Sequence, residues 1–334
     1  MAKLKEFILT NFVKSFLTLF VPFFIIIALT YLIKISNLSS RVNLEFLDFA
    51  TIFMYVLPHI FFASIPLTFI GATINTFAKL SEENEAVAIF SLGYSPIKIY
   101  SYLLPLALLF SIFLTALTLY IIPYADQYMD NFKSKKIYDA KLRILPKKLS
   151  QSFGKQHIFI DSSQNNRFKN VTMFSEDSDG YMQIMLSKSG SIKNNKDEKS
   201  YLSLDNGSLY RYKDKNFQII DFANLKLYNN KKFYSHKILK PKEFWKKYLK
   251  KFYYFLLISL SPILVLPLLI ALGLFNPRYQ KNRASIYILL TTLLVYIPAI
   301  LAKEKVSIYV TLSIMAVWII LSIVLFREKL VKRY

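Results

Sequence analysis

Three glutamates stand close together at an unusual place in this sequence. Residues 78–100, AKLSEENEAVAIFSLGYSPIKIY, put Glu82, Glu83 and Glu85 between two long stretches that carry no charged side chain. Carboxylates within one helical turn can bind basic side chains of a partner, and they also stabilise a helix start through the macrodipole. The segment is therefore a candidate for binding another protein.

Residue combinations that carry out catalysis are missing from the sequence. There is no cysteine, and the three histidines, His59, His157 and His236, are far apart, so we expect no disulfide, no metal site and no cofactor. The Gly154–Lys155 pair lacks the glycine spacing and the hydroxyl residue of a phosphate-binding loop. The sequence thus predicts that the protein is not an enzyme and that any ATP is hydrolysed by a partner. We expect His59 to be a hydrogen-bonded packing residue.

Six long runs without Asp, Glu, Lys or Arg divide the chain. They are residues 15–33, 49–78, 99–125, 252–277, 284–302 and 306–326. A helix needs about 20 apolar residues to cross about 30 Å of hydrocarbon, so each run predicts a transmembrane helix. The sequence predicts three parts: residues 1–125 with three crossings, an inserted domain at 126–245, and residues 246–334 with three more crossings.

Basic residues indicate how the chain is oriented. Six crossings put both termini on one side, and the short loops on the other side carry only Lys34, Arg41, Lys303 and Lys305. The tails and loops on the terminal side are much richer in Lys and Arg, so the positive-inside rule predicts cytoplasmic termini. No small-residue cleavage site follows the first run, which favours a crossing over a cleaved signal peptide. The insert then lies outside the cytoplasm.

The insert has the pattern of a β domain. Residues 156–163, 170–177, 180–192 and 201–229 alternate between apolar and polar side chains, as strands do. Asp-Asn-Gly at 205–207 and Lys-Asp-Lys-Asn at 213–216 separate apolar alternations, which is typical of hairpins. We predict a mostly antiparallel all-β domain, a sandwich or jelly roll, preceded by a helix over residues 126–144 that leaves the membrane.

The acidic segment falls in the predicted cytoplasmic loop between crossings two and three. Ser81 is a candidate N-cap, and the apolar positions predict a short helix over about 80–92. Gly93 suits a helix C-terminus, and Ser95 followed by Pro96 predicts the start of the next helix. A simple connection needs only a few residues, so an ordered helix here favours a docking role.

The charge of this helix favours a protein partner over a lipid surface. Amphipathic helices that rest on membranes usually carry Lys or Arg on the polar face, whereas this one carries glutamates. We expect Glu82 and Glu85, which are three residues apart, to share one helical face that meets a basic pocket on a cytosolic protein.

The stretch KLSEENEAVAIFSLGYSPIKI resembles the cytoplasmic coupling helix of the LptF/LptG permeases, the membrane subunits of the lipopolysaccharide-transport ABC exporter. Glu85, Gly93 and Ser95 match the acidic, glycine and serine positions of that segment. The resemblance covers essentially the whole chain, since HIFIDSS and LSLDNGSLY are similar to strands of the family's jelly roll. Asn276-Pro277-Arg278, within ALGLFNPRYQKNRASIYILL, favours the LptF-like branch.

The resemblance implies a specific machine. A cytosolic LptB-like ATPase dimer would dock on Glu82, Glu85, Ile89, Gly93 and Ser95, and an LptG-like permease would complete the membrane part. Lipopolysaccharide would pass from the inner membrane to the jelly roll and on to LptC-like and LptA-like proteins; nucleic acid is not among the expected partners.

The same resemblance implies that basic residues near the outer end of the first crossing bind substrate. Lys34 and Arg41 lie in that region and are the candidates for holding a lipid phosphate or a core-sugar carboxylate. The alternative for Lys34 is a side chain that extends along the lipid to reach the interface.

Three other functions remain open from the sequence alone. An ABC-type permease for another lipid or lipoprotein is one, although such permeases usually have four crossings and a large domain after the first. A membrane scaffold with an envelope-binding β domain is another, but it has no need of the acidic helix. A membrane enzyme is the weakest, because no catalytic set of residues is present.

Overall fold

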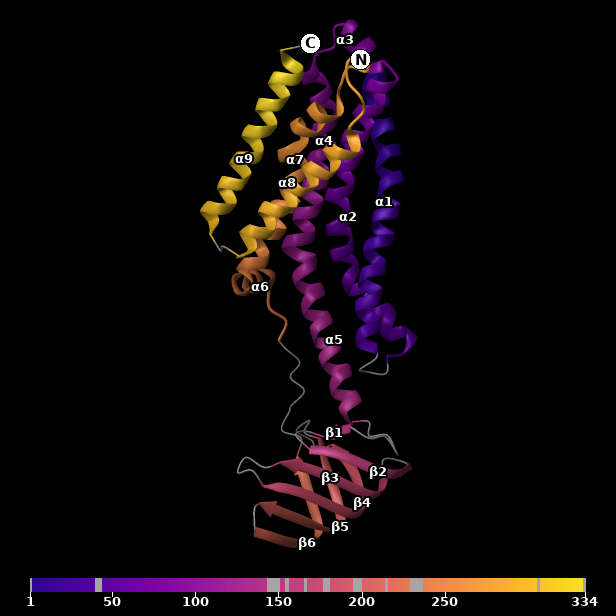
Figure 1. Ribbon diagram of the computed structural model, residues 1–334, viewed down its shortest axis with the longest axis vertical. Helices are drawn as coiled ribbons and strands as arrows, with labels where there is room; N and C mark the ends of the chain where they lie inside the picture. The colour runs from indigo at the N-terminus through magenta and orange to yellow at the C-terminus, as the bar shows by residue number, and fades with distance from the viewer. Residues whose placement is uncertain are drawn as a thin grey trace. The chain divides into compact units, whose positions relative to one another are not determined.

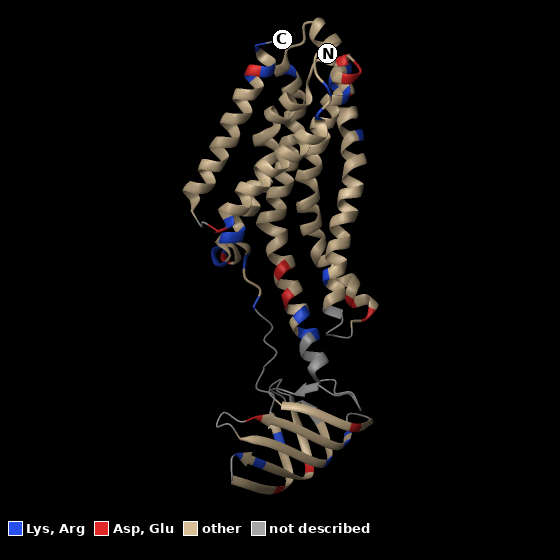
Figure 2. Cartoon of the chain, viewed as in Figure 1, with Lys and Arg blue, Asp and Glu red and all other residues tan. Residues whose placement is uncertain are grey.

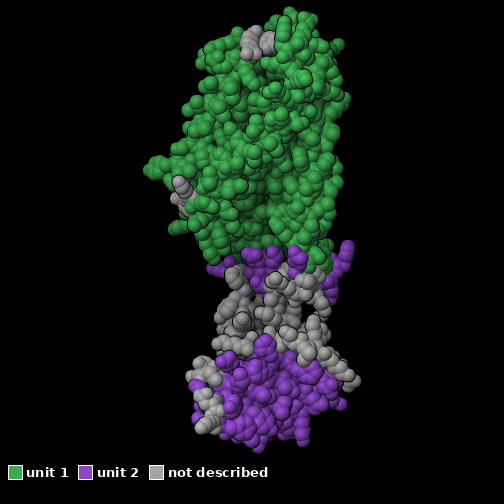
Figure 3. Space-filling view, viewed as in Figure 1, with its two compact units in different colours: residues 1–36, 47–129, 238–334 green, residues 37–46, 130–237 purple. Residues whose placement is uncertain are grey.

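The structure is a computed structural model that describes residues 2–39, 44–142, 151–153, 156–164, 167–176, 181–194, 200–213, 216–228, 237–304 and 307–332. Its contacts divide the chain into two compact units (Figure 3). Unit 1 contains residues 1–36, 47–129 and 238–334, and unit 2 contains residues 37–46 and 130–237.

Helices make up unit 1 (Figure 1). They are α1 (Ala2–Ser39), α2 (Phe46–Glu82), α3 (Glu85–Ser91), α4 (Pro96–Ala116), α5 (Ile122–Leu142), α6 (Pro241–Lys247), α7 (Leu249–Gly273), α8 (Ala284–Glu304) and α9 (Ile308–Phe326). Two five-residue π-helical turns extend this set, η1 (Leu117–Ile121) between α4 and α5 and η2 (Arg327–Val331) after α9. Part of α5 continues into unit 2.

Six of these helical segments are long and apolar enough to cross a membrane, which confirms the prediction from the charge-free runs. The spans are Lys3–Asn37, Phe46–Glu82, Pro96–Lys136, Leu249–Gly273, Ala284–Glu304 and Ile308–Val331. Figure 2 shows charged residues mainly near the ends of the spanning helices and along α5. The predicted helix at 126–144 is confirmed as α5 up to Leu142, where the described residues end.

The helices pack around α7, which contacts α4, α8 and α9 and is the most buried of the six spans. Phenylalanine rings join α1 to its neighbours: Phe12 lies 5.6 Å from Phe69 on α2, and Phe16 lies 4.9 Å from Phe110 on α4, between ring centroids. Such offset or tilted ring pairs add to the packing energy of the helices. This bundle fixes the positions of the loops at its two ends.

Unit 2 contains one antiparallel sheet of six strands in sequential order. The strands are β1 (Gln151–Phe153), β2 (Gln156–Gln164), β3 (Arg167–Glu176), β4 (Met182–Asn194), β5 (Ser200–Lys213) and β6 (Asn216–Tyr228). The inserted antiparallel β domain is therefore confirmed. Sequence neighbours pair with each other throughout, so the described strands form a meander.

The sheet buries one cluster of apolar side chains and exposes another. Side chains that alternate along β3, including Phe168, Val171 and Met173, are buried with residues of β2, β4 and β5. Ile184 and Leu186 on β4 and Ile219 on β6 are exposed although they are apolar. Exposed apolar side chains on a sheet often mark a surface that binds another protein, a membrane or an apolar ligand.

The predicted hairpin at 213–216 is confirmed, and the predicted turn at 205–207 is wrong. Lys213 pairs with Asn216, whereas β5 runs through Asn206 and Gly207 without a turn. Asn206 has a φ of 53° inside the strand, and a Cβ on Gly207 would lie 2.2 Å from the carbonyl oxygen of Leu186. Asn and Gly tolerate a positive φ in a kinked strand as well as in a turn, which explains the error.

Candidate functional site

The acidic segment between α2 and α4 is a short helix bounded by two breaks. α2 continues to Glu82, a turn follows at Glu83 and Asn84, and α3 begins at Glu85. Asn84 takes a left-handed conformation, with φ 59° and ψ 7°, which ends α2 and redirects the chain. The helix in this segment is therefore α3 alone, and it is shorter than the predicted helix over about 80–92.

Ser81 is not the N-cap that the sequence suggested. It lies in the last turn of α2, where its side chain is buried and its hydroxyl accepts a hydrogen bond from the Phe275 amide at 3.1 Å. Serine suits a helix start by propensity, but here a distant backbone donor determines its role. The residue joins the end of α2 to the loop that follows α7.

The C-terminus of α3 follows the prediction for Gly93. Its φ is +80°, its amide donates to Phe90 at 3.0 Å, and the Tyr94 amide donates to Ile89 at 3.4 Å. This pair of bonds is the Schellman arrangement, which requires a left-handed residue just after the helix. Ser95 then precedes Pro96, the first residue of α4, also as predicted. The chain thus holds α3 between two fixed turns.

Glu82 and Glu85 do not share a helical face, because the break at residues 83–84 separates them. Glu82 belongs to α2, and its Oε1 accepts a hydrogen bond from the Asn282 amide nitrogen at 2.8 Å. Glu85 is half-buried at the start of α3, and its Oε2 is buried without a hydrogen-bond partner among the described residues. The prediction of a common face is therefore wrong.

The free oxygen of Glu85 lies beside a small cavity of about 110 Å³. Asn11 and Lys14 of α1 line this cavity together with Lys79 from the end of α2 and Glu83 from the turn that follows. An unpaired carboxylate oxygen that is removed from solvent is costly, so a donor that reaches it gains a strong, charge-assisted hydrogen bond.

The outward surface of α3 is apolar. Ile89 is only 8% exposed and packs into the core of unit 1, so it anchors the helix. Val87 on α3 is 40% exposed, and Leu92, directly after α3, is 76% exposed; both lie in the stretch that joins the spans α2 and α4. An exposed apolar helix face that is rimmed by acids is typical of a docking surface.

The loop between α7 and α8 forms hydrogen bonds with the end of α2, next to α3. The sequence did not indicate these bonds. Residues 274–283 contribute both the Phe275 amide that bonds Ser81 and the Asn282 side chain that bonds Glu82. Asn276, part of the Asn-Pro-Arg motif, folds the loop: its Oδ1 accepts from the Arg278 amide at 3.0 Å. No local pattern could have revealed the bonds to Ser81 and Glu82, because their partners are about 200 residues away in sequence.

Of the two predicted substrate-binding residues, the structure describes Lys34, which lies near the C-terminal end of α1. Lys34 is exposed, and its ammonium lies 4.9 Å from the centre of the Tyr31 ring, a cation–π distance. Arg41 lies outside the described residues.

Three polar contacts lie near the start of α5. The first confirms the expectation that His59 is a hydrogen-bonded packing residue, and the sequence did not indicate the other two. The Nε2 of His59 on α2 lies 3.2 Å from the Oδ1 of Asp126, at hydrogen-bonding distance. The side chain of Gln127 donates to the carbonyl of Leu239 and accepts from its amide. These bonds join the two chain segments that lead out of and back into the helical unit.

The third contact holds the π-helical turn η1. The Trp245 indole nitrogen on α6 donates to the Thr118 carbonyl at 3.0 Å, and the hydroxyl of Thr118 lies 2.9 Å from that of Ser259 on α7. π-turns leave backbone groups that need other partners, and Trp245 of α6 supplies one here, while Ser259 of α7 bonds the side chain of Thr118.

Fold and site together define a multi-pass membrane protein with an inserted antiparallel β unit and a short helix between two spans. A sequence model of one family, the lipopolysaccharide export system permease LptF/LptG, matches residues 6–327, and the chain belongs to that family. It is a permease of the lipopolysaccharide export system in the inner membrane, a transport subunit and not an enzyme. No curated protein matches the sequence.

Proposed function

We propose that this chain is the transmembrane subunit through which ATP hydrolysis, in a separate cytosolic subunit, drives lipopolysaccharide out of the inner membrane. The observation that carries this proposal is α3, a helix held between two turns, with Val87 exposed on it and Leu92 exposed directly after it. Membership of the LptF/LptG family supports it. The Asn276-Pro277-Arg278 motif favours the LptF-like branch.

The ATPase, an LptB-like dimer, docks on α3 by combining apolar contact with one buried charge. Val87 and Leu92 supply the apolar surface, while the unpaired oxygen of Glu85 receives a basic side chain of the ATPase at the cavity beside α1. Gly93 and Ser95 act through the backbone, because they end α3 and begin α4.

Movement of α3 spreads to several spanning helices. The helix lies between α2 and α4 in the chain, so a displacement acts directly on both. The hydrogen bonds of Ser81 and Glu82 to residues 275 and 282 carry the same displacement to α7 and α8. Coupling of this kind requires contiguous contacts, which the loop 274–283 provides.

On the opposite side, Lys34 and Arg41 hold anionic groups of lipopolysaccharide near the outer end of α1. The exposure of Lys34 supports this role. The exposed apolar side chains of the sheet, such as Ile184 and Leu186, then receive acyl chains and pass them to LptC-like and LptA-like proteins. An LptG-like permease supplies the other half of the membrane cavity. Both termini are cytoplasmic, and the β unit is periplasmic.

Photocrosslinking to lipopolysaccharide tests the substrate part of this proposal. Lys34→Glu is compared with Lys303→Glu, which makes the same charge change in the last turn of α8, on the same predicted side. We expect Lys34→Glu to reduce crosslinking severalfold while the chain still assembles with its partners. Equal crosslinking in both variants would contradict the role of Lys34.

A further inference from the structure

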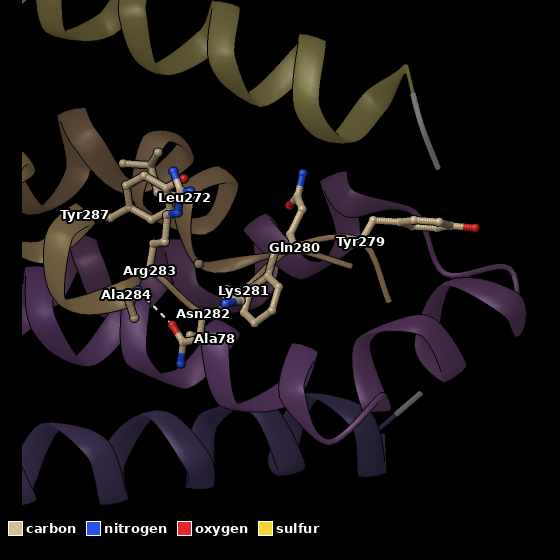
Figure 4. Close-up of a pocket in the computed structure, with 11 residues that line it drawn as sticks. Ala78, Leu272, Tyr279, Gln280, Lys281, Asn282, Arg283, Ala284 and Tyr287 are labelled. Carbon is tan, nitrogen blue, oxygen red and sulfur yellow. Dashed lines mark hydrogen bonds between the residues drawn. The ribbon is translucent and has the colours of Figure 1, made fainter. Parts of the chain in front are cut away.

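A cavity of about 480 Å³ lies in unit 1 beside the loop between α7 and α8 (Figure 4). Its walls come from three places in the chain: Ala78 near the end of α2, Leu272 and Gly273 at the end of α7, and the loop leading to Tyr287 on α8. The cavity therefore joins apolar side chains of spanning helices to the polar residues that connect them.

Two cations line this cavity, and the lining contains no carboxylate. Lys281 and Arg283 are both exposed, and neither forms an ion pair with a carboxylate in the part of the chain that the structure describes. Lys329 adds a third positive charge nearby, since its ammonium lies 5.4 Å from the ring of Tyr287. The nearest acid that bonds a lining residue is Glu82, whose Oε1 is already occupied by the Asn282 side chain.

The first backbone amide of α8 is not available to a ligand in this cavity. The Oδ1 of Asn282 accepts a hydrogen bond from the Ala284 amide at 2.7 Å, so that amide is occupied. A ligand in this cavity is bound by the side chains of Lys281 and Arg283. Arginine binds phosphate oxygens through two parallel hydrogen bonds, and lysine adds a mobile positive charge.

The position of the cavity favours a lipid as the source of that phosphate. The loop connects two membrane spans, Leu249–Gly273 and Ala284–Glu304, so it lies where headgroups meet hydrocarbon. Tyr279 is 84% exposed on the same loop, and tyrosine is enriched at this depth. Basic pockets between membrane helices on the cytoplasmic side bind anionic headgroups.

We propose that this cavity binds the phosphate headgroup of an anionic membrane phospholipid. The site is separate from the path of lipopolysaccharide and does not depend on ATPase docking. Occupancy neutralises Lys281 and Arg283 next to Asn282, and it thereby stabilises the loop that bonds Ser81 and Glu82. With the orientation proposed above, the lipid comes from the cytoplasmic leaflet.

Native mass spectrometry of the detergent-purified full chain tests this site. The chain is titrated with phosphatidylglycerol, with zwitterionic phosphatidylethanolamine and with inorganic phosphate. Lys281→Gln/Arg283→Gln removes both cations of the cavity. Arg278→Gln/Lys332→Gln removes the same charge from two residues that do not line it.

We expect phosphatidylglycerol to bind more tightly than phosphatidylethanolamine. The cavity variant should lose about five-fold in affinity per cation, while the control variant binds as the unaltered chain does. A thermal unfolding curve of each variant confirms that it is folded. Equal loss in the two variants, equal binding of the two lipids, or displacement of the lipid by inorganic phosphate at similar concentration would each overturn the proposal.

Discussion

Gly273, the last residue of α7, permits a close approach between α7 and α2 that no larger residue allows. A Cβ at this position would lie 2.7 Å from the Cβ of Phe77 and 2.8 Å from the carbonyl oxygen of Ile74. Both neighbouring atoms belong to or adjoin the backbone of α2, so they can retreat only if the helix moves. Small residues at such contacts are typical of membrane helix packing.

The expected cost of Gly273→Ala follows from this geometry. Carbon atoms pack at about 3.5–4.0 Å, so the helices must separate by roughly 0.8 Å or more. Overpacking of this kind costs about 1–3 kcal/mol. At about 2–4 °C per kcal/mol, the apparent Tm should fall by roughly 2–12 °C. The bond between Phe275 and Ser81, two residues further on, should weaken as well.

Gly71→Ala is the matched control for this prediction. Its Cβ would lie 3.1 Å from the Cδ1 of Leu19, the end of a flexible side chain, and 3.9 Å from the Cγ2 of Ile288, an ordinary contact distance. Alanine also favours the interior of α2, by about 1 kcal/mol over glycine. Thermal unfolding in detergent, followed by the loss of the monodisperse peak, compares the two variants. If Gly273→Ala is as stable as Gly71→Ala, the close contact between α2 and α7 is refuted.

Three further predictions concern the β unit, its connections and the orientation of the chain. Gln127→Ala removes two hydrogen bonds to Leu239, each worth about 1 kcal/mol. Limited proteolysis should therefore cut the chain next to Leu239 faster, and unchanged cleavage would argue against the contact between Gln127 and Leu239. Gly207→Ala places a Cβ against a carbonyl oxygen of β4, so we expect loss of the near-ultraviolet circular dichroism and protease resistance of unit 2; a native-like spectrum would count against the kinked strand. The chain has no cysteine, so Leu92→Cys and Asp221→Cys each introduce a unique thiol. In intact cells with a permeable outer membrane, an impermeant maleimide should label only Asp221→Cys, and the reverse result would invert the proposed orientation.

The sequence was sufficient for features that depend on local composition. Charge-free runs identified the six spans, because charged side chains are too costly within hydrocarbon. Gly93 and Ser95–Pro96 were placed correctly, because a left-handed residue and a fixed φ leave few alternatives. Strand alternation identified the inserted sheet for the same reason.

Features that depend on distant partners could not be predicted. The sequence allows a helix either to start or to end at Ser81, Glu82 and Asn84. Hydrogen bonds to residues about 200 positions away place Ser81 and Glu82 at the end of α2. The side chain of Glu85 turned toward α1 for a similar reason, since that cavity forms only when the helices pack. Local propensity cannot register such contacts.

Co-purification of a cytosolic ATPase with the tagged chain tests the docking of α3 most directly. We predict that the unaltered chain and Glu328→Lys, a charge reversal away from α3, both recover the ATPase in the same amount. Glu85→Lys and Leu92→Asp should lose it while their thermal unfolding shows a folded chain. Full recovery with both α3 variants, or no ATPase with the unaltered chain, would contradict the proposal that ATP-driven motion enters through α3.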